Sequence, residues 1–308
     1  MSKLPLVVVA GPTASGKTAL AVELAKRLNG EVVSADSMQV YCGMPIATAC
    51  PTADERQGIP HHLQECVPLT ESYSVARYAK RAREIIADIH ARGKLPILCG
   101  GTGLYIAAVT DNVLYEEQND ASTAAVRERL TREADLLGDQ AMWDKLNAVD
   151  PALASKLHIH DRGRIFRGLE VFETTGVTMS EMQRRQKEVP SPYDVNMILL
   201  NFRDRSRLYD RIDRRVDLMV EAGLLEETAR IVRLSSSTAD QAIGCKELRP
   251  YFDGECSLAA ALDCMKRRSR QYAKRQLSWF RRLDDTVTLY VDDYASVEEL
   301  ADAAILNV

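Results

Sequence analysis

Residues 11–18 read GPTASGKT, a combination of glycines, a lysine and a hydroxyl residue that can bind a polyphosphate. Gly11 and Gly16 let the backbone curl so that its N–H groups point inward at an anion. Lys17 adds a full positive charge, the helix that follows adds a partial one, and the Thr18 hydroxyl can reach Mg²⁺. A glycine-rich turn that merely joins a strand to a helix is the alternative. The residues on both sides favour a phosphate-binding loop.

A second chemical group is Asp36, which follows an apolar segment at residues 31–35. Because the carboxyl ends of strands line the ligand crevice of an open parallel sheet, Asp36 would lie beside the bound phosphates. There it could act as a general base and take a proton from an attacking group. The alternative is a cap for the turn that follows. We favour the catalytic role.

A third apolar run, residues 95–99, leads into GGTGLY at residues 100–105. ATPases and many kinases place an acidic residue at such a point to help hold Mg²⁺. No carboxylate stands here, which argues against nucleotide hydrolysis. The glycines could let the backbone approach a ligand closely, or could simply form a tight strand-to-helix turn.

The elements that must position these groups alternate between apolar runs and helical patterns, which predicts βαβ units. The fold class is therefore α/β, with a P-loop NTPase-like parallel sheet covered by helices. The strands expected are residues 4–10, 31–35, 95–99, 195–202 and 287–291. The helices expected around them are residues 17–29, 74–92, 206–222 and 257–283.

Residues 116–190 show no strand pattern and predict an all-helical insertion domain. Residues 1–115 and 191–308 would then form the core domain. The helices expected in the insertion are residues 122–137, 139–148, 150–157, 161–175 and 178–187.

Composition points to a globular enzyme, because 46% of the 308 residues are hydrophobic and 27% are charged. The seven cysteines are scattered without a C-x-x-C pair, which favours reduced thiols and a cytoplasmic location. The apolar run at residues 4–10 is too short to span a membrane and leads directly into the loop. We therefore expect a core strand there and no membrane partner. The chain is further expected to be a monomer.

Basic residues concentrate at 266–282, where eight Lys and Arg residues occur without an acidic one. The net charge of the whole chain is only −4, so it does not by itself indicate nucleic acid. The run could be a solvated helix face. Tyr272, Trp279 and Phe280 within it favour an RNA-facing surface equally well.

An ordered set of motifs resembles the tRNA dimethylallyltransferase family. These motifs are GPTASGKT at 11–18, DSMQVY at 36–41, HHL at 61–63, GGTGLY at 100–105, RIFRGLEV at 164–171, RIDRRVDLM at 211–219, IGCKE at 243–247 and RQLSWFR at 275–281. They follow the family's order and span most of the chain.

This resemblance implies transfer of a dimethylallyl group from dimethylallyl pyrophosphate to the exocyclic amine of adenine 37, just 3′ of the anticodon. The tRNAs would be those that read codons beginning with U. Although the loop is an ATP-binding motif by type, it would hold the leaving pyrophosphate with Mg²⁺. The pyrophosphate-binding residues expected are Gly11, Pro12, Thr13, Ala14, Ser15, Gly16, Lys17, Thr18 and Arg215.

Two residues are implied at the reacting centre, with Asp36 as the base and Thr102 as a further contact. Arg215 is implied as the pyrophosphate clamp. Its alternative is one more arginine on an amphipathic helix, since Arg211 and Arg214 are close by.

The resemblance also implies contacts to the anticodon stem-loop. The residues expected are Asp36, Ser37, Met38, Gln39, Thr102, Arg127, Arg164, Arg167, Gln241, Gly244 and Lys246. From the residues alone, the three arginines on the insertion helices could equally be solvated. Two stretches depart from the family's usual pattern: ATACP at 47–51 lacks a basic residue, and GCK at 244–246 lacks an aromatic one.

Three other functions use part of these features. A small-molecule P-loop kinase would use Asp36 as the base for a hydroxyl, although a Walker-B acid is missing. An isopentenyltransferase acting on free adenine nucleotide would share the loop and the acid, but would need neither the insertion nor the basic helix. A non-enzymatic RNA-binding protein would leave Lys17, Thr18 and Asp36 unexplained.

Overall fold

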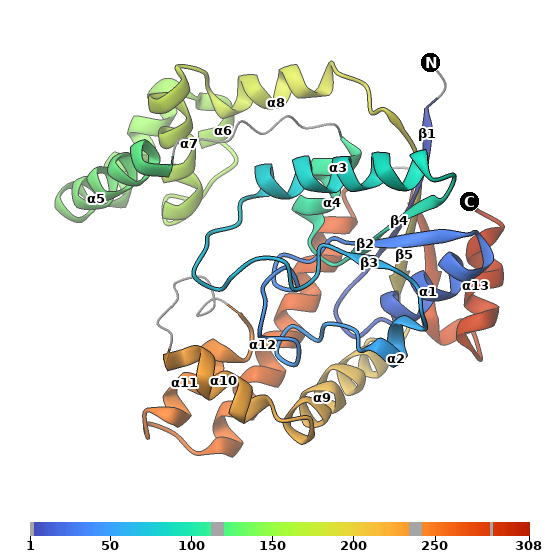
Figure 1. Ribbon diagram of the computed structural model, residues 1–308. Helices are drawn as coiled ribbons and strands as arrows, with labels where there is room; N and C mark the ends of the chain where they lie inside the picture. Colours follow the sequence, from blue (N-terminus) through green and yellow to red (C-terminus); the bar gives the residue numbers. More distant parts are fainter. Residues whose placement is uncertain (1–2, 112–119, 234–241, 284–285) are drawn as a thin grey trace. The chain divides into compact units, whose positions relative to one another are not determined.

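A computed structural model of the chain describes residues 3–111, 120–233, 242–283 and 286–308. Its strands form one parallel sheet in the order β3-β2-β4-β1-β5-β6 (Figure 1). The strands are β1 (Leu4–Ala10), β2 (Gly30–Ser34), β3 (His61–His62), β4 (Leu95–Gly100), β5 (Tyr193–Asn201) and β6 (Thr286–Tyr290). The expected parallel α/β sheet is confirmed, with strand ends shifted by one or two residues.

Helices cover both faces of this sheet, which is why β1 is a nearly continuous apolar run. On one face, Val8 packs in a cluster with residues of α3 (Val75–Ala91) and α4 (Gly103–Thr110). On the other face, Val7 packs with residues of α1 (Lys17–Arg27) and α13 (Val297–Ile305). Because β1, β2 and β4 are parallel neighbours, their carboxyl ends lie side by side at one end of a sheet that helices cover on both faces.

Further helices of the core unit follow β2 and β5. They are α2 (Ala53–Arg56), α9 (Arg205–Glu221), α10 (Leu224–Arg233), α11 (Cys245–Phe252), α12 (Leu258–Phe280) and the 3₁₀ turn η2 (Val291–Asp293). The long helices α9 and α12 lie where the periodicity predicts them. The sequence reasoning missed α2, α10, α11 and the two-residue β3, of which α2 and β3 are too short to show a clear period. None of the helices in the described ranges combines the length and the apolar character that crossing a bilayer requires.

Two compact units divide the chain, one formed by Met1–Thr110 with Pro192–Val308 and the other by Asp111–Ser191. In the second unit the described residues form helices and no strand, as expected. Its helices are α5 (Asp120–Val149), α6 (Pro151–Ala154), α7 (Arg162–Thr175) and α8 (Met179–Lys187). Gly138 breaks α5 with a left-handed φ of 84°.

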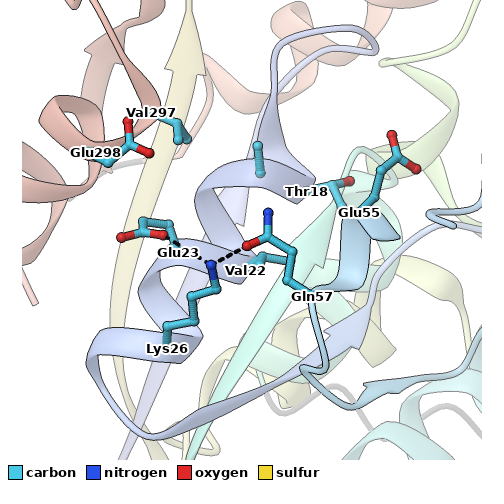
Figure 2. A pocket seen from close by; sticks show the side chains of 9 residues that line it. Thr18, Val22, Glu23, Lys26, Glu55, Gln57, Val297 and Glu298 are labelled. Carbon is cyan, nitrogen blue, oxygen red and sulfur yellow. Dashed lines mark hydrogen bonds and ion pairs between the residues drawn. The ribbon is translucent and has the colours of Figure 1, made fainter. Parts of the chain in front are cut away.

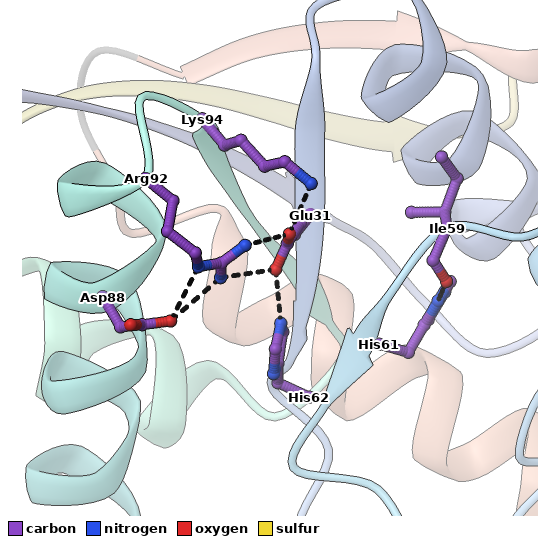
Figure 3. A network of polar contacts seen from close by, with 7 residues as sticks. All are labelled: Glu31, Ile59, His61, His62, Asp88, Arg92 and Lys94. Carbon is purple, nitrogen blue, oxygen red and sulfur yellow. Dashed lines mark hydrogen bonds and ion pairs between the residues drawn. The ribbon is translucent and has the colours of Figure 1, made fainter.

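A polar network at the amino end of β2 explains the HHL motif (Figure 3). The Glu31 side chain is 2% exposed and accepts hydrogen bonds from Arg92 Nη2 at 2.8 Å and Lys94 Nζ at 2.8 Å. His62 Nε2 lies 2.8 Å from Glu31 Oε2, the oxygen that also accepts from Arg92 Nη2. Since β3 is only two residues long, this contact helps to hold it against β2. The network lies toward the amino ends of the strands, whereas the P-loop follows the carboxyl end of β1.

Candidate active site

The loop between β1 and α1 has the curled backbone that anion binding needs. Gly16 at the start of α1 has a φ of 90°, and Ala14 has a φ of 62°. A Cβ atom on Gly11 would lie 2.8 Å from the carbonyl oxygen of Leu200 on β5, so only glycine fits there. The first N–H groups of α1 have no intrahelical acceptor, and no acidic residue lies in its first turn. This end of α1 can therefore receive an anion.

Lys17 folds back over the loop and donates a hydrogen bond from Nζ to the Pro12 carbonyl oxygen at 2.7 Å. Burial, the main cause, and the positive charge of Arg215 together lower the pKa of this ammonium to about 8. The thiol of Cys99 and the carboxylate of Asp36 oppose that shift. A bound polyanion would favour the charged form, so the site is prepared for negative charge.

Asp36 lies directly after β2 and within electrostatic range of both Lys17 and Arg215. Its Oδ1 accepts hydrogen bonds from the backbone N–H of Met38 at 2.9 Å and of Gln39 at 3.3 Å. The side chain therefore does cap the turn, which was the alternative interpretation. Among the described residues nothing donates to Oδ2, so capping and proton transfer can be shared between the two oxygens.

The glycine-rich turn after β4 packs against protein groups. A Cβ on Gly100 would lie 2.1 Å from the Ala35 carbonyl oxygen, and one on Gly103 would lie 2.2 Å from the Trp279 ring. The tight-turn interpretation thus accounts for these glycines, and close approach to a ligand is not needed to explain them. Thr102, between them, accepts a hydrogen bond from the Ser37 N–H at 3.1 Å on its hydroxyl. This contact places Thr102 beside the Asp36 turn.

Two arginines reach the loop from α9. Arg215 is half-buried, and burial lowers the pKa of its guanidinium, whereas Asp36 and Glu55 oppose the shift. Arg211 donates a hydrogen bond from Nε to the Ala14 carbonyl oxygen at 2.9 Å. The sequence reasoning treated Arg211 only as a neighbour on the helix. Its one-turn spacing from Arg215 is the signal that could have placed both on the same helix face.

A cleft of about 190 Å³ lies on the outer side of α1 (Figure 2). Thr18 is its only residue from the loop, and Glu23, Glu55 and Glu298 are among the others that line it. Lys26, which also lines the cleft, pairs with Glu23 at 3.7 Å. With three carboxylates and one lysine, this lining is less suited to a polyphosphate than the Lys17 side of the loop.

The expected RNA contacts in the core unit differ in what their side chains already bind. The Gln39 amide is used within the protein: its Oε1 accepts from Ser34 Oγ at 3.1 Å, and its Nε2 donates to the Ala49 carbonyl oxygen at 3.2 Å. Lys246 is exposed on α11, and the Gly244 N–H donates to a Glu247 side chain oxygen at 2.9 Å. Gln241 lies outside the described residues.

The two departures from the family pattern concern cysteines that are both buried. Cys50 is 8% exposed and Cys245 is 1% exposed. The Arg56 guanidinium lies 3.7 Å from the Cys50 sulfur, while burial raises the pKa of that thiol to about 11. Neither side chain is available to a large substrate.

In the helical unit, two of the three expected arginines converge on one buried acid. Glu170 is 0% exposed and accepts a hydrogen bond from Arg127 Nη2 at 2.8 Å. An Arg167 nitrogen lies 3.8 Å from the same carboxylate. Arg164 is exposed and pairs with Asp161 at 3.4 Å. Arg127 and Arg167 therefore have a structural role, whatever else they contact.

The basic face of α12 is divided by its contacts with α9. Lys266 pairs with Asp217 at 2.6 Å, and Arg270 pairs with Asp213 at 2.5 Å. Six other cations of this helix and the turn after it are exposed: Arg267, Arg268, Lys274, Arg275, Arg281 and Arg282. Only the exposed set offers charge to a large anionic partner.

The parallel sheet and the loop after β1 define an α/β protein of the P-loop class. The chain belongs to the IPP transferase family, whose profile matches residues 39–283. The tRNA dimethylallyltransferase of Thermoanaerobacter sp. strain X514 is 46% identical over 301 residues, covering 96% of this chain and 95% of the relative. That of Halalkalibacterium halodurans is 47% identical over 281 residues, covering 91% and 88%.

Solved structures agree with this family. A full-length tRNA isopentenylpyrophosphate transferase from Bacillus halodurans has a TM-score of 0.72 and 42% identity, covering 99% of this chain and 95% of that one. A eukaryotic dimethylallyltransferase described as acting on tRNA has a TM-score of 0.82 and 31% identity, covering 99% and 79%. The resemblance read from the ordered motifs is confirmed.

Proposed function

We propose that this chain transfers a dimethylallyl group from dimethylallyl pyrophosphate to the exocyclic amine of adenine 37 in tRNA. The observation that carries the proposal is the convergence of Lys17, Asp36 and Arg215 at the carboxyl edge of the sheet, with Thr102 beside them. Relatives named tRNA dimethylallyltransferase support the same reaction. One chain supplies all these groups, which supports action as a monomer. The cysteines, all of which lie in the described residues, form no disulfide there, and this supports a cytoplasmic location.

In this reaction the amine nitrogen attacks the first carbon of the allyl group. The carbon–oxygen bond to pyrophosphate breaks, and its electron pair leaves with the pyrophosphate oxygen. Lys17, Arg215 and the loop amides stabilise the charge that develops there. Asp36 takes the proton from the amine. The base must leave its stack to reach these groups, so we expect it to be flipped out.

The loop also suits pyrophosphate and a divalent cation. The Ser15 hydroxyl is fully buried and has no hydrogen-bond partner among the described residues, so a phosphate oxygen could satisfy it. The described residues hold no cluster of three His, Cys, Asp or Glu side chains that could bind a metal. Mg²⁺ often takes few protein ligands and several from phosphate and water. We propose that Thr18 holds Mg²⁺, which would neutralise the leaving pyrophosphate.

The test offers labelled dimethylallyl pyrophosphate and labelled ATP in parallel to unmodified tRNA, an anticodon stem-loop and AMP. We expect label from the allylic donor in tRNA and in the stem-loop, and none in the matched Lys17→Ala variant above about 1% of wild type. Phosphoryl transfer from ATP to an acceptor would indicate a kinase, and prenylation of AMP alone would indicate a nucleotide isopentenyltransferase. Binding of tRNA without transfer would indicate a non-enzymatic protein.

A further inference from the structure

One buried amide joins the two loops that carry the proposed chemistry. Gln276 on α12 is 5% exposed. Its Oε1 accepts a hydrogen bond from the Thr13 N–H at 2.9 Å, and its Nε2 donates to the Gly101 carbonyl oxygen at 3.0 Å. The backbone pairing of β1 with β4 ends at Ala10 and Gly100, three residues before Thr13 and one residue before Gly101. The Gln276 amide thus connects the two strands where their own hydrogen bonds stop.

The surroundings of Gln276 admit an amide and little else. The site needs an acceptor facing Thr13 and a donor facing Gly101, which a carboxylate, an ammonium or an apolar side chain cannot supply together. A Cβ atom on Gly101 would lie 2.1 Å from Gln276 Nε2, so the glycine leaves the room that the amide fills. The Tyr272 hydroxyl, one turn earlier on α12, interacts with both Thr102 and Gln276.

We infer that Gln276 is a positioning residue, which sets the P-loop relative to the Thr102 turn and contacts no RNA. This inference rests on the proposed function. The P-loop would hold the leaving pyrophosphate, and Thr102 lies beside the Asp36 turn that would receive the amine proton. Their separation decides whether donor carbon and acceptor nitrogen meet. Because exposed Lys274 and Arg275 precede Gln276 on α12, the same helix carries an exposed basic face and holds the donor loop.

The test is Gln276→Met, which keeps the volume and removes both hydrogen bonds, with Gln271→Met on the exposed side of α12 as the matched control. We expect kcat for transfer to tRNA to fall about 30- to 100-fold, as for a misplacement near 1 Å. The Kd for tRNA should stay within about twofold, because phosphate contacts provide most of the affinity. Gln271→Met should change neither. A tenfold weaker Kd at unchanged kcat would overturn the inference in favour of an RNA contact, and no change in either would overturn it as well.

Gly101→Ala disturbs the contact between Gly101 and the Gln276 amide by adding a Cβ atom next to Nε2. It provides a second test in case Gln276→Met does not fold. It should lower kcat to a similar extent. The double variant should be hardly worse than either single one, because the contact is lost only once. Multiplicative losses would mean that the two residues act independently and would overturn the inference.

A readout independent of transfer separates this inference from the proposed function. Hydrogen exchange of the peptide containing Thr13 should become at least about tenfold faster in Gln276→Met and stay unchanged in Gln271→Met. If the wild-type chain fails to prenylate tRNA while this acceleration is observed, the proposed function fails and the positioning of the loop stands. Unchanged exchange would overturn the positioning itself.

Discussion

At the residue scale, the proposed chemistry depends on two cations and one carboxylate that lie close together. Arg215 and Asp36 lie within electrostatic range of Lys17, and Asp36 also lies within electrostatic range of Arg215. The two cations are desolvated, so an arriving pyrophosphate would restore lost interactions for both. The electrostatic free energy of these two cations is therefore less favourable in the empty site than in the site with pyrophosphate bound.

Asp36→Asn isolates proton transfer from turn capping. Asparagine keeps an oxygen that can accept from the Met38 N–H, so the turn should remain. We expect kcat to fall about 10²–10⁴-fold while donor affinity is retained. Steady-state transfer and pyrophosphate binding measure the two effects. Full activity in this variant would leave Asp36 as a turn cap only.

The pKa of Lys17 predicts a pH dependence of donor binding. Because the pKa lies near 8, affinity for the allylic donor should fall by up to about tenfold per pH unit above 8. Cys99 stays protonated there, since burial raises the pKa of its thiol to about 12. Lys17→Arg, which cannot lose its charge, should bind more weakly but without this pH dependence. A sloping profile in the arginine variant would assign the titration to another group.

The same pKa shift acts on stability in the opposite direction. The unfolded chain keeps the Lys17 proton up to about 10.5, whereas the folded chain releases it near 8. The unfolded state then binds more protons, so the Lys17 contribution to the free energy of unfolding rises between these two pH values. Denaturant titrations of wild type and Lys17→Met at pH 7.5 and 9.5 should converge as the pH rises.

At the scale of elements, helices α9 and α12 determine which cations remain available. Asp213 and Asp217 on α9 neutralise Arg270 and Lys266, whereas Arg267 and Arg268 between them stay exposed. The basic residues of α12 are thus divided into some that pair with acids of α9 and others that face solvent. The division follows from the helical period and from the acids of the neighbouring helix.

Two matched double variants test this division. Arg267→Gln with Arg268→Gln should reduce the slope of log affinity for tRNA against log salt by about one to two units. Lys266→Gln with Arg270→Gln should leave the slope nearly unchanged and lower the free energy of unfolding by about 1 kcal/mol instead. Equal changes of slope in both would show that the ion pairs with α9 do not persist in the complex.

The Glu31 network links β2, β3 and the end of α3. Hydrogen bonds from Arg92 hold the pKa of the Glu31 carboxyl well below its ordinary value, with Lys94 and His62 contributing and burial opposing. Glu31→Gln should therefore lower the free energy of unfolding at pH 7. The expected loss is about 2 kcal/mol, because Arg92, Lys94 and His62 are partly exposed and water can solvate them once the carboxylate is gone. Asp88→Asn, at the exposed end of the same network, should cost less than about 0.5 kcal/mol.

The sign of the pH dependence follows from the lowered pKa. The stabilisation from Glu31 is fully present above about pH 4.5, the value in the unfolded chain, and is lost as the pH falls toward the folded value. Urea unfolding of wild type and Glu31→Gln should thus differ less at pH 3 than at pH 7. A constant difference would contradict the network as drawn in Figure 3.

At the scale of the whole molecule, the chain separates donor chemistry from a helical unit with its own core. Lys17, Asp36, Thr102 and Arg215 all belong to the unit formed by Met1–Thr110 and Pro192–Val308. The other unit has a cluster of buried residues of its own, and its buried Glu170 is held by arginines of the same unit. Each unit can thus be perturbed separately.

Glu170→Gln should loosen the helical unit alone. Losing a buried carboxylate leaves Arg127 and Arg167 without their partner, which should speed hydrogen exchange in α5 and α7 by about tenfold or more. Affinity of the chain for pyrophosphate should stay unchanged, because its expected ligands lie in the other unit. A parallel loss of pyrophosphate affinity would show that the two units are energetically coupled.

The sequence by itself determined the P-loop, the parallel sheet, the long helices and the family, because these depend on local order. GPTASGKT between an apolar run and a helical pattern has few structural outcomes, and β1, α9 and α12 lie within a few residues of their predicted ends. Only the tertiary structure decided which distant groups meet. Gln276 reaches Thr13 across 263 positions, and Glu31 takes its partners from 31 to 63 positions away. Periodicity reports which face of an element is buried, whereas these pairs depend on how elements pack, and packing follows from the shape of the whole core.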